Sequence, residues 1–471
     1  MVKNFYIALL IIFCSFLSSK STYLYLRLFE DKFISQKLIY PFSKNLDRAA
    51  RLSKKVIMDN LVKNNQNTSE EVDPEILNLK SAWHDLLITT HEGKNFLSHG
   101  CREGDNNPDE FCYRNKKYTW GIPGGYIDSV SDKRIIGSDG VGNIFSFNLK
   151  TIKFQKIRSN LNVIYNNQNF KGKYIENLQG RFGVRDIFYD KKEKFILASM
   201  FIDVDKNACY GIAIYKAKYD LNENYSIEDL KFNQFFITKK CNKNFNGHAS
   251  GGRIKKLGEN YILTVGDLDH NLSGNRSIPQ SSSNTIGKVI SISPDGSNYK
   301  IISKGHRNQQ GLEIVGADIF ITEHGPKGGD EINLVKDSQH YGWPYYVYGF
   351  GYDDKVKFRF PHENNFKKPI FYFTPSIGIS EIVFYDKEEF PFWKNKFIVS
   401  SLIGRSLFIL DYDAEKKKII SSEKITIGSR IRDLNLTNDG QILIVTDDQK
   451  LLILSRDGVD HSKNNRDLIP F

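Results

Sequence analysis

Residues able to carry acid–base chemistry lie at the two ends of a short segment in the middle of this chain. His248 precedes and Asp267 follows two apolar runs, which are joined by the turn Leu257-Gly258-Glu259-Asn260. Short apolar runs around such a turn are typical of a β-hairpin. Folding the hairpin about its turn brings His248 and Asp267 to its open end. A neutral imidazole there can accept a proton, because the pKa of an unperturbed histidine lies near neutral.

A second segment of the same design carries an arginine and a histidine. Its turn lies at residues 315–318, and its open end is predicted to bring together Arg307, His324, Gly325 and Pro326. Arginine can stabilise negative charge that develops on a substrate.

A third segment turns at residues 437–440 and presents Arg430, Arg432 and Asp447 at its open end. Two arginines spaced two residues apart lie on one face of a strand and suit bidentate binding of carboxylates. The alternative is a salt bridge to Asp433 or Asp447. Because the three hairpins have the same polarity, we expect their chemistry to share one pocket.

The elements that position these residues are predicted to be strands. Hydrophobic residues make up 40% of the 471 residues and aromatic residues 13%, a balance that favours an all-β fold. Strand–turn–strand units recur from about residue 81 to the end, and no long amphipathic helix interrupts them, which disfavours a βαβ sheet. Such recurrence is typical of a β-propeller. A β-sandwich is the alternative, although the repeating region is long for one.

Charge and short motifs exclude several classes of function. The net charge is +11, but the lysines and arginines are dispersed rather than gathered in a basic block. Nucleic acid is therefore not an expected partner. The GPKGG stretch lacks the Walker spacing, and neither a GxSxG elbow nor an HExxH motif is present.

The first 80 residues differ from the rest. Lys3 precedes an apolar run from Ile7 to Leu17 and then small polar residues, as in a secretory signal. We therefore expect residues 1–33 to form a signal peptide or an uncleaved membrane anchor. Residues 34–80 are predicted to form a short helix and a linker, and residues 81–471 the propeller. The expected location is periplasmic or extracellular, with anchoring to the inner membrane as the variant.

The cysteines agree with export. Besides Cys14 in the apolar run, the chain has Cys101, Cys112, Cys209 and Cys241. An even number in an exported chain suggests disulfides, and four cysteines allow three connectivities. Proximity in sequence favours Cys101–Cys112 and Cys209–Cys241. A zinc site is the weaker alternative, because the chain has no Cys-x-x-Cys pair.

Motifs at the same hairpins resemble those of the glucose/sorbosone dehydrogenases, also called aldose sugar dehydrogenases. They are GHRNQQGL, TEHGPKGGDEINLV, HYGWP, GKVISISPDGS and IRDLNLTNDG, and the resemblance spans about residues 175–455. It implies a six-bladed β-propeller that uses pyrroloquinoline quinone (PQQ) and calcium. The implied reaction is oxidation of an aldose or related alcohol by hydride transfer to the quinone. The electron acceptor remains unidentified.

The resemblance also implies roles for individual residues, and all of them are expectations. His248 would be the general base, Asp267 would orient and polarise it, and Arg307 would stabilise developing negative charge. The implied cofactor contacts are Asn308, Arg430, Arg432 and Gln179, and the implied calcium ligands are Gly325 and Pro326 at the cofactor and Glu331 and Tyr341 at a structural ion. The alternative function is a non-catalytic exported propeller that binds carbohydrate or protein after loss of the cofactor.

Overall fold

A computed structural model of the chain describes residues 75–80, 85–92, 125–151, 153–168, 183–205, 209–219, 230–242, 248–270, 276–351, 366–447 and 450–456. The chain divides into two compact units, residues 1–73 and 74–471, and all the described residues belong to the second. The predicted signal or anchor segment, Cys101, Cys112 and Gln179 lie outside the described residues. Within the described part, no helix is long and apolar enough to span a membrane.

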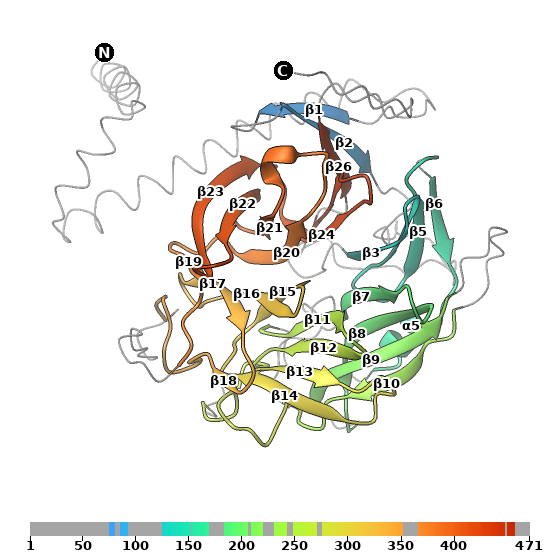
Figure 1. The fold of residues 1–471 in the computed structure, drawn as a ribbon. Coiled ribbons are helices and arrows are strands. Elements are labelled where there is room, and N and C mark those ends of the chain that lie inside the picture. Colours follow the sequence, from blue (N-terminus) through green and yellow to red (C-terminus); the bar gives the residue numbers. More distant parts are fainter. Residues whose placement is uncertain are drawn as a thin grey trace, which may run out of the picture. The chain divides into compact units, whose positions relative to one another are not determined.

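The described residues form six sheets arranged around an axis (Figure 1). The first sheet consists of β3 (Tyr126–Ser131), β4 (Arg134–Ser138), β5 (Ile144–Asn148) and β6 (Lys153–Ile157). The second consists of β7 (Val184–Asp190), β8 (Phe195–Asp203), β9 (Tyr210–Lys218) and β10 (Asn233–Ile237). The third consists of β11 (Gly251–Leu257), β12 (Asn260–Val265), β13 (Lys288–Ile292), β14 (Tyr299–Lys304) and β18 (Gln339–His340). The fourth sheet consists of β15 (Gln309–Val315), β16 (Asp318–Glu323), β17 (Asp330–Val335) and β19 (Phe371–Phe373). The fifth consists of β20 (Ile379–Tyr385), β21 (Lys396–Ser401), β22 (Ser406–Asp413) and β23 (Lys418–Thr426). The sixth consists of β24 (Ile431–Leu436), β25 (Ile442–Thr446), β26 (Lys450–Arg456), β2 (Asp85–Glu92) and β1 (Glu75–Lys80). Helical structure in this part is confined to α5 (Leu161–Asn166) and the 3₁₀ turn η4 (Pro391–Trp393).

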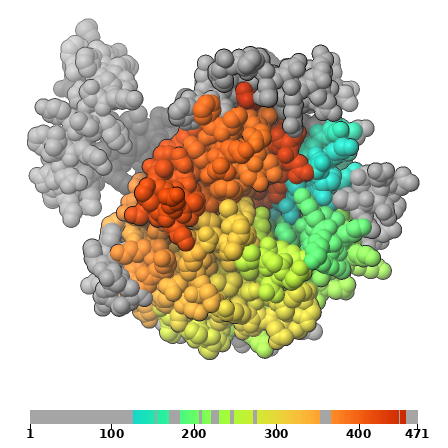
Figure 2. Space-filling view, viewed as in Figure 1, coloured from blue at the N-terminus to red at the C-terminus, as the bar shows by residue number. Residues whose placement is uncertain are grey.

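The sheets close into a ring. Their innermost strands, β3, β7, β11, β15, β20 and β24, contact one another in that order, and β24 returns to β3. The sheets follow one another around the ring in sequence order, from cyan through green and yellow to red (Figure 2). The prediction of an all-β, six-bladed β-propeller is therefore confirmed.

The last sheet combines strands from both ends of the described chain. β2 pairs with β26 in antiparallel register, with Leu86 opposite Arg456, and β1 pairs with β2. The linker was expected to extend to residue 80, but Glu75–Lys80 forms β1. A short strand at the end of a polar stretch has no turn signal of its own, and the sheet that it joins through β2 is completed by β26, far along the chain.

The three chemistry-bearing hairpins form as predicted. β11 pairs with β12 up to Leu257 and Asn260, and β15 pairs with β16 up to Val315 and Asp318. β24 and β25 form the third hairpin. The turn residues fixed these hairpins locally, which is why the sequence alone could identify them.

Burial explains why strands inside each sheet are continuously apolar. β25 is buried at every position, whereas the outer strand β23 is mostly exposed. Each sheet is covered on both faces by its neighbours. For example, Leu197 and Ile212 of one sheet pack in one cluster with Leu263 and Ile290 of the next. Burial of these side chains drives the packing of sheet against sheet.

A buried guanidinium lies at the axis of the ring. Nη1 of Arg253, in β11, is 3.2 Å from Asp186 of β7, 2.8 Å from Glu381 of β20 and 2.7 Å from Asp433 of β24. All four side chains are nearly inaccessible to solvent. One cation thus holds carboxylates from three other sheets.

Arg253 also contacts the remaining two sheets. Its Nε donates to the Gln310 carbonyl of β15 at 2.6 Å, and its guanidinium carbon lies 4.8 Å from the ring centroid of Tyr126 in β3. Nη2 donates to the carbonyl of Arg432 at 3.2 Å. The innermost strands of all six sheets therefore meet at one side chain.

The carboxylates bound by Arg253 connect neighbouring sheets with their other oxygen atoms. Asp186 accepts from the backbone N–H of Ile254 at 2.7 Å, and Asp433 accepts from that of Ile127 at 2.8 Å. Glu381 binds a backbone N–H of β15 in the same way. Charge-assisted hydrogen bonds of this kind are stronger than neutral ones.

One predicted disulfide lies within the described residues and is present. Cys209 and Cys241 are joined, with a sequence separation of 32 residues. The bond connects the beginning of β9 to the segment after β10. It closes a loop at the outer edge of the second sheet.

Replacement of Arg253 by Met is predicted to lower the free energy of unfolding by about 3–5 kcal/mol, because three buried carboxylates lose their cation. Burial raises the pKa of Asp186 to about 7 and that of Glu381 to about 8, although Arg253 opposes both shifts. Below these pKa values the acids are protonated and their burial costs little. The loss should therefore grow as the pH rises from about 6 to about 8.5, measured by chemical denaturation.

Arg253→Lys is the matched control, since it keeps the charge but loses the planar fork. We expect a smaller loss and a weaker dependence on pH than in Arg253→Met. An equal, pH-independent loss in both variants would show that packing rather than charge holds the axis together.

Replacement of both Cys209 and Cys241 by Ser is predicted to lower the free energy of unfolding by about 3–4 kcal/mol, because the bond restricts the unfolded chain. The test is the guanidinium midpoint without reductant, together with mass spectrometry of non-reduced peptides from the native protein. Absence of a linked Cys209–Cys241 peptide in exported material would contradict the prediction.

Candidate active site at the axis of the propeller

Five of the six innermost strands begin with irregular pairing, at the end where the predicted site residues lie. The register shifts within the first residues of β7, β11, β15, β20 and β24. A bulge changes the direction of the side chain that it carries. Arg185, Gln310 and Arg432 are each the second residue of their strand. Because Arg253 contacts the early residues of the other five strands, these ends lie together.

The structure places His248 and Asp267 at the open end of the first hairpin. Leu268 N donates to the Ala249 carbonyl at 3.0 Å, so the residues that follow His248 and Asp267 face each other. Ala249 has φ 48° and Leu268 has φ 49°. Non-glycine residues in this region cost about 1–3 kcal/mol and cluster at functional sites. The His248 side chain is exposed, whereas Asp267 is buried.

The Asp267 carboxylate is fixed by donors from two directions. It accepts from Nε1 of Trp343 at 2.7 Å and from the backbone N–H of Asp269 at 3.0 Å. Its own N–H donates to the Arg307 carbonyl at 2.7 Å. Burial raises the pKa of Asp267 to about 7, although the charge of Arg307 opposes the shift. This carboxyl group therefore titrates near neutral pH.

Arg307 joins the first hairpin to the second. Its Nη1 donates to the carbonyls of His324 and Gly325 at 3.1 and 3.0 Å. Its guanidinium carbon lies 5.3 Å from the ring centroid of Trp343, the same ring that donates to Asp267. A cation over an aromatic face is attracted by the ring. Asp267, Trp343 and Arg307 thus form one connected group.

A buried pair behind Arg307 fixes its backbone. Glu323 accepts from the Arg307 N–H and from Nδ1 of His306, the latter at 2.8 Å. Nε2 of His306 is 2.8 Å from the Ser303 hydroxyl, and the imidazole stacks on Tyr341 with ring centroids 4.6 Å apart. The sequence had not indicated this support for Arg307.

His324 lies among the arginines of the second and third hairpins. Burial lowers the pKa of His324 to about 4. Asp330 opposes this shift, with its Oδ1 4.0 Å from Nδ1 of His324. The charges of Arg307, Arg432 and Arg430 add to it. The imidazole is therefore neutral near pH 7 and lies within the electrostatic reach of arginines from two hairpins.

The segment with the predicted calcium carbonyls is held by Asp330. This buried residue accepts from the Gly325 N–H at 3.1 Å and from the Ile377 N–H at 3.0 Å. A side chain at Gly325 would come within 2.3 Å of the Gly328 carbonyl, so only glycine fits there. Pro326 is buried next to it.

Arg430 and Arg432 share a carboxylate. Nε of Arg430 lies 2.9 Å from Asp447, and Arg432 binds the same group through Nε at 2.9 Å and Nη2 at 3.1 Å. Burial acts to raise the pKa of Asp447, but the two arginines outweigh it and the net shift is downward. The salt bridge to Asp447 considered as the alternative from the sequence is therefore present. Two arginines against one acid leave a net positive charge.

Asn308 connects the first two hairpins through its side chain. Its Oδ1 accepts from the Gly251 N–H at 3.2 Å and from Nε2 of Gln310 at 2.9 Å. Its carbonyl accepts from the His324 N–H at 3.0 Å. Asn308 therefore lies between the ends of β11 and β15, beside the arginine group.

Glu331 and Tyr341, the predicted ligands of a structural calcium, lie on either side of the Glu323–His306 pair. Glu331 is opposite Glu323 in the sheet and receives a hydrogen bond from Asn333 at 3.1 Å. Burial and the charge of Glu323 raise the pKa of Glu331 well above its usual value. Adjacent buried acids suit a cation. The Tyr341 hydroxyl donates to the Leu334 carbonyl at 2.6 Å.

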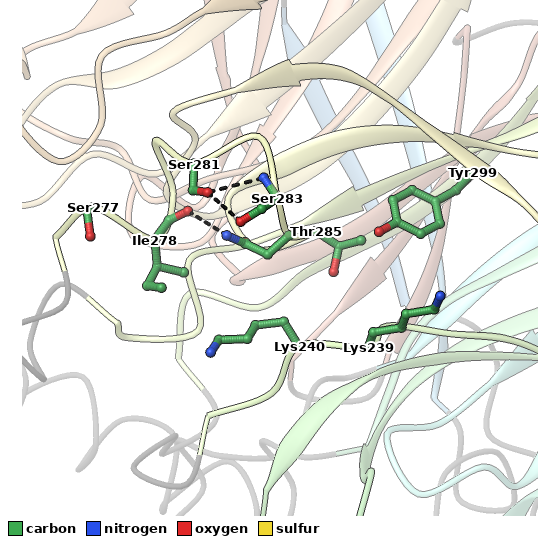
Figure 3. A pocket seen from close by; sticks show the side chains of 9 residues that line it. Lys239, Lys240, Ser277, Ile278, Ser281, Ser283, Thr285 and Tyr299 are labelled. Carbon is green, nitrogen blue, oxygen red and sulfur yellow. Dashed lines mark hydrogen bonds between the residues drawn. The ribbon is translucent and has the colours of Figure 1, made fainter.

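A cavity of about 410 Å³ lies elsewhere, between the outer parts of the second and third sheets (Figure 3). Its lining includes the polar side chains of Lys239, Lys240, Asn284, Thr285 and Tyr299 and the apolar side chain of Ile278. None of the predicted site residues lines it. The chemistry at the axis is therefore separate from this cavity.

Two site residues could have been found from sequence signals. Trp343 belongs to the HYGWP motif, and Asp447 was predicted at the open end of the third hairpin but given no role beyond a competing salt bridge to the arginines. By contrast, Arg253 carries no local signal, because its partners lie on other strands. Glu323 belongs to the TEHGPKGGDEINLV motif, but the motif did not indicate its contacts with His306 and Arg307. Positive φ at Ala249 and Leu268 has none either, since neither is glycine.

Comparison with known proteins agrees with this geometry. The family described as Glucose / Sorbosone dehydrogenase matches residues 179–454. Aldose sugar dehydrogenase YliI of Escherichia coli is 27% identical over 223 residues, covering 43% of this chain and 58% of the relative. An uncharacterized protein of Synechocystis is 30% identical over 223 residues, covering 43% of this chain and 54% of the relative. The chain thus spans little more than half of these curated relatives.

Solved structures share the fold. The apo-form of the soluble aldose sugar dehydrogenase of Escherichia coli superposes with a TM-score of 0.57 at 20% identity, covering 72% of this chain and 97% of that one. The PQQ-bound aldose sugar dehydrogenase of Streptomyces coelicolor gives a TM-score of 0.54 at 16% identity, covering 82% and 99%. Since the family match extends over more than half of the sequence, the chain belongs to the glucose/sorbosone dehydrogenase family.

Proposed function

We propose that this protein is a quinoprotein dehydrogenase that oxidises an aldose sugar or a related alcohol with PQQ and calcium. One observation carries the proposal. Arg307, Arg430 and Arg432, from the second and third hairpins, lie near His324, and Arg307 also lies near Asp267 of the first hairpin. Family membership supplies the class of reaction, which those residue types suit.

Residues of the first hairpin would accept the substrate proton and stabilise the charge that results. His248 is exposed at the open end and would accept the proton of the sugar hydroxyl. Asp267, held by Trp343, would stabilise the imidazolium that forms. Arg307 would stabilise negative charge on the substrate or cofactor oxygen, and Glu323 holds its backbone in place.

The charges at the third hairpin fit an anionic cofactor. Arg307, Arg430 and Arg432 exceed the neighbouring Asp447 in charge, so a polycarboxylate would be attracted there. When bound, PQQ would accept the hydride and calcium would act as a Lewis acid. We assign the cofactor calcium to the carbonyls of Gly325 and Pro326.

The remaining assignments are also part of the proposal. Asn308 and Gln179 would contact the cofactor, and Glu331 with Tyr341 would hold a structural calcium. The apolar N-terminal run supports export to the periplasm or beyond, cleaved or anchored to the inner membrane. The electrons would pass to an acceptor that the chain does not identify.

One observation favours the alternative of a non-catalytic propeller. Asp447 already neutralises part of the charge of Arg430 and Arg432, and the Gly325 carbonyl already accepts from Arg307. Charged and polar groups that are already paired within the protein do not require a cofactor as a partner. A carbohydrate-binding or protein-binding role would then remain, and cofactor binding separates the two functions.

Calorimetry is predicted to show PQQ binding in the presence of calcium and weaker binding after treatment with a chelator. Arg432→Ala should weaken PQQ binding by roughly 1.5–3 kcal/mol, the value of a charge-assisted hydrogen bond. Asp447→Asn is the control, because it removes the competing anion and should leave PQQ affinity equal or higher. No binding to the wild type would favour the non-catalytic alternative.

His248→Gln is predicted to leave PQQ affinity unchanged and to lower kcat about a hundredfold or more, as expected for loss of a general base. Because burial raises the pKa of Asp267 to about 7, the wild-type rate should rise as the pH increases through 7 and this carboxyl group ionises. Asp267→Asn should lose that inflection. Wild-type turnover by fully loaded His248→Gln would exclude His248 as the base.

A further inference from the structure

Two innermost strands begin with the same three-residue pattern. β7 begins with Val-Arg-Asp at residues 184–186, and β24 begins with Ile-Arg-Asp at residues 431–433. The aspartate of each pattern binds Nη1 of Arg253, at 3.2 and 2.7 Å, and also accepts an N–H from the next innermost strand. The arginines before them, Arg185 and Arg432, therefore occupy equivalent positions in two sheets.

In the sheet of β24, the arginine has a carboxylate partner. Asp447 follows β25, and its N–H donates to the Arg430 carbonyl at 2.8 Å. From this position its carboxylate binds Nε and Nη2 of Arg432, at 2.9 and 3.1 Å. The two nitrogen atoms form one edge of the guanidinium and bind the acid side by side.

In the sheet of β7, an aromatic ring takes the place of that acid. The N–H of Phe201, on β8, donates to the carbonyl of Gly183, two residues before Arg185, at 3.3 Å. In the same way, the N–H of Asp447 donates to the carbonyl of Arg430, two residues before Arg432. The Arg185 guanidinium lies 5.5 Å from the centroid of the Phe201 ring. Phe201 is thus the counterpart of Asp447 and offers no negative charge.

The Arg185 edge that corresponds to the paired edge of Arg432 is buried and lacks a hydrogen-bond acceptor. Arg185 is 6% exposed, and its Nε and Nη2 have no hydrogen-bond partner. No carboxylate among the described residues forms a salt bridge with it, and its hydrogen-bonding side chain is that of Tyr126. Burial lowers the pKa of Arg185, and the charge of Arg432 adds to this.

Burial of an unpaired cation is unfavourable, and arginine stays protonated in proteins. Arg185 therefore lacks the kind of anionic partner that Asp447 provides for Arg432. We propose that Arg185 binds a carboxylate of the ligand at the axis, through the same Nε–Nη2 edge that Arg432 uses for Asp447. The carboxylate belongs either to the quinone cofactor or to an acidic sugar substrate. Only this identification of the ligand rests on the proposed function.

The first experiment uses Arg185→Gln, which keeps hydrogen-bond donors but removes the charge. PQQ with calcium is titrated into wild type and variant by calorimetry. The enzyme loaded with saturating cofactor is then assayed with glucuronate and glucose, which differ in a carboxylate. Arg185→Lys accompanies it, since it keeps the charge without the bidentate edge and serves if Arg185→Gln does not fold.

Phe201→Asp is the matched variant, because it places a carboxylate at the position equivalent to Asp447 while Arg185 remains. It should pair with Arg185 inside the protein and exclude the external anion. We therefore expect it to reproduce the ligand-binding loss of Arg185→Gln. Full wild-type binding in a folded Phe201→Asp protein would count against the proposal.

The outcomes identify the source of the carboxylate. If the cofactor supplies it, Arg185→Gln weakens PQQ binding about tenfold or more and affects both sugars alike. If the substrate supplies it, PQQ affinity is unchanged and KM rises about tenfold for glucuronate but not for glucose. Unchanged PQQ affinity together with unchanged KM for both sugars overturns the inference and leaves the proposed function intact.

Failure of the proposed function has a different signature. If wild type binds no PQQ, glucuronate and glucose are titrated into the protein without cofactor. Binding of glucuronate to wild type but not to Arg185→Gln would still support an anion site at Arg185. Binding to neither protein, or equally to both, would overturn it.

Discussion

The fold depends on a single cation shared by six strands. Arg253 contacts the innermost strand of every sheet, and three of these contacts are to buried carboxylates. Lys255, two residues along the same strand, adds a second positive charge near Asp186 and Glu381. An apolar side chain could fill the axis but could not bind carboxylates from three sheets. The strands are therefore positioned around one charge, and removal of that charge leaves buried acids unpaired.

The same interaction determines where the chemistry lies. Arg253 fixes Asp186 and Asp433, and the arginine before each aspartate is held at the same end of the axis. The hairpins of β11 and β15 bring Asp267 and Arg307 to this end. Structural charge and site charge thus occupy successive residues of the same strands. A substitution at Arg253, Asp186 or Asp433 is therefore expected to displace the site residues, although none of these three side chains is assigned a contact with a ligand.

What the sequence could predict follows from how local each signal is. The hairpins of Asp267, Arg307 and Arg432 were predictable because their turns are specified by adjacent residues. The contact of Trp343 with Asp267 joins residues 76 apart, and the pairing of β2 with β26 joins opposite ends of the described chain. Neither has a local pattern. The roles of Arg253 and Phe201 depend on which strands become neighbours, and only the folded ring shows this.

The way in which the ring is completed has a consequence for how the protein folds. The last sheet needs β2 and β26, with Leu86 opposite Arg456, so its hydrogen bonds cannot form until nearly all of the described chain is available. Pairing at such sequence separation is slow, because the entropy of closing a long loop precedes any gain. Until then β2 and β26 have unpaired edges that can recruit other chains. Chains in which β26 has not yet paired with β2 are therefore expected to be more prone to aggregation than the closed ring.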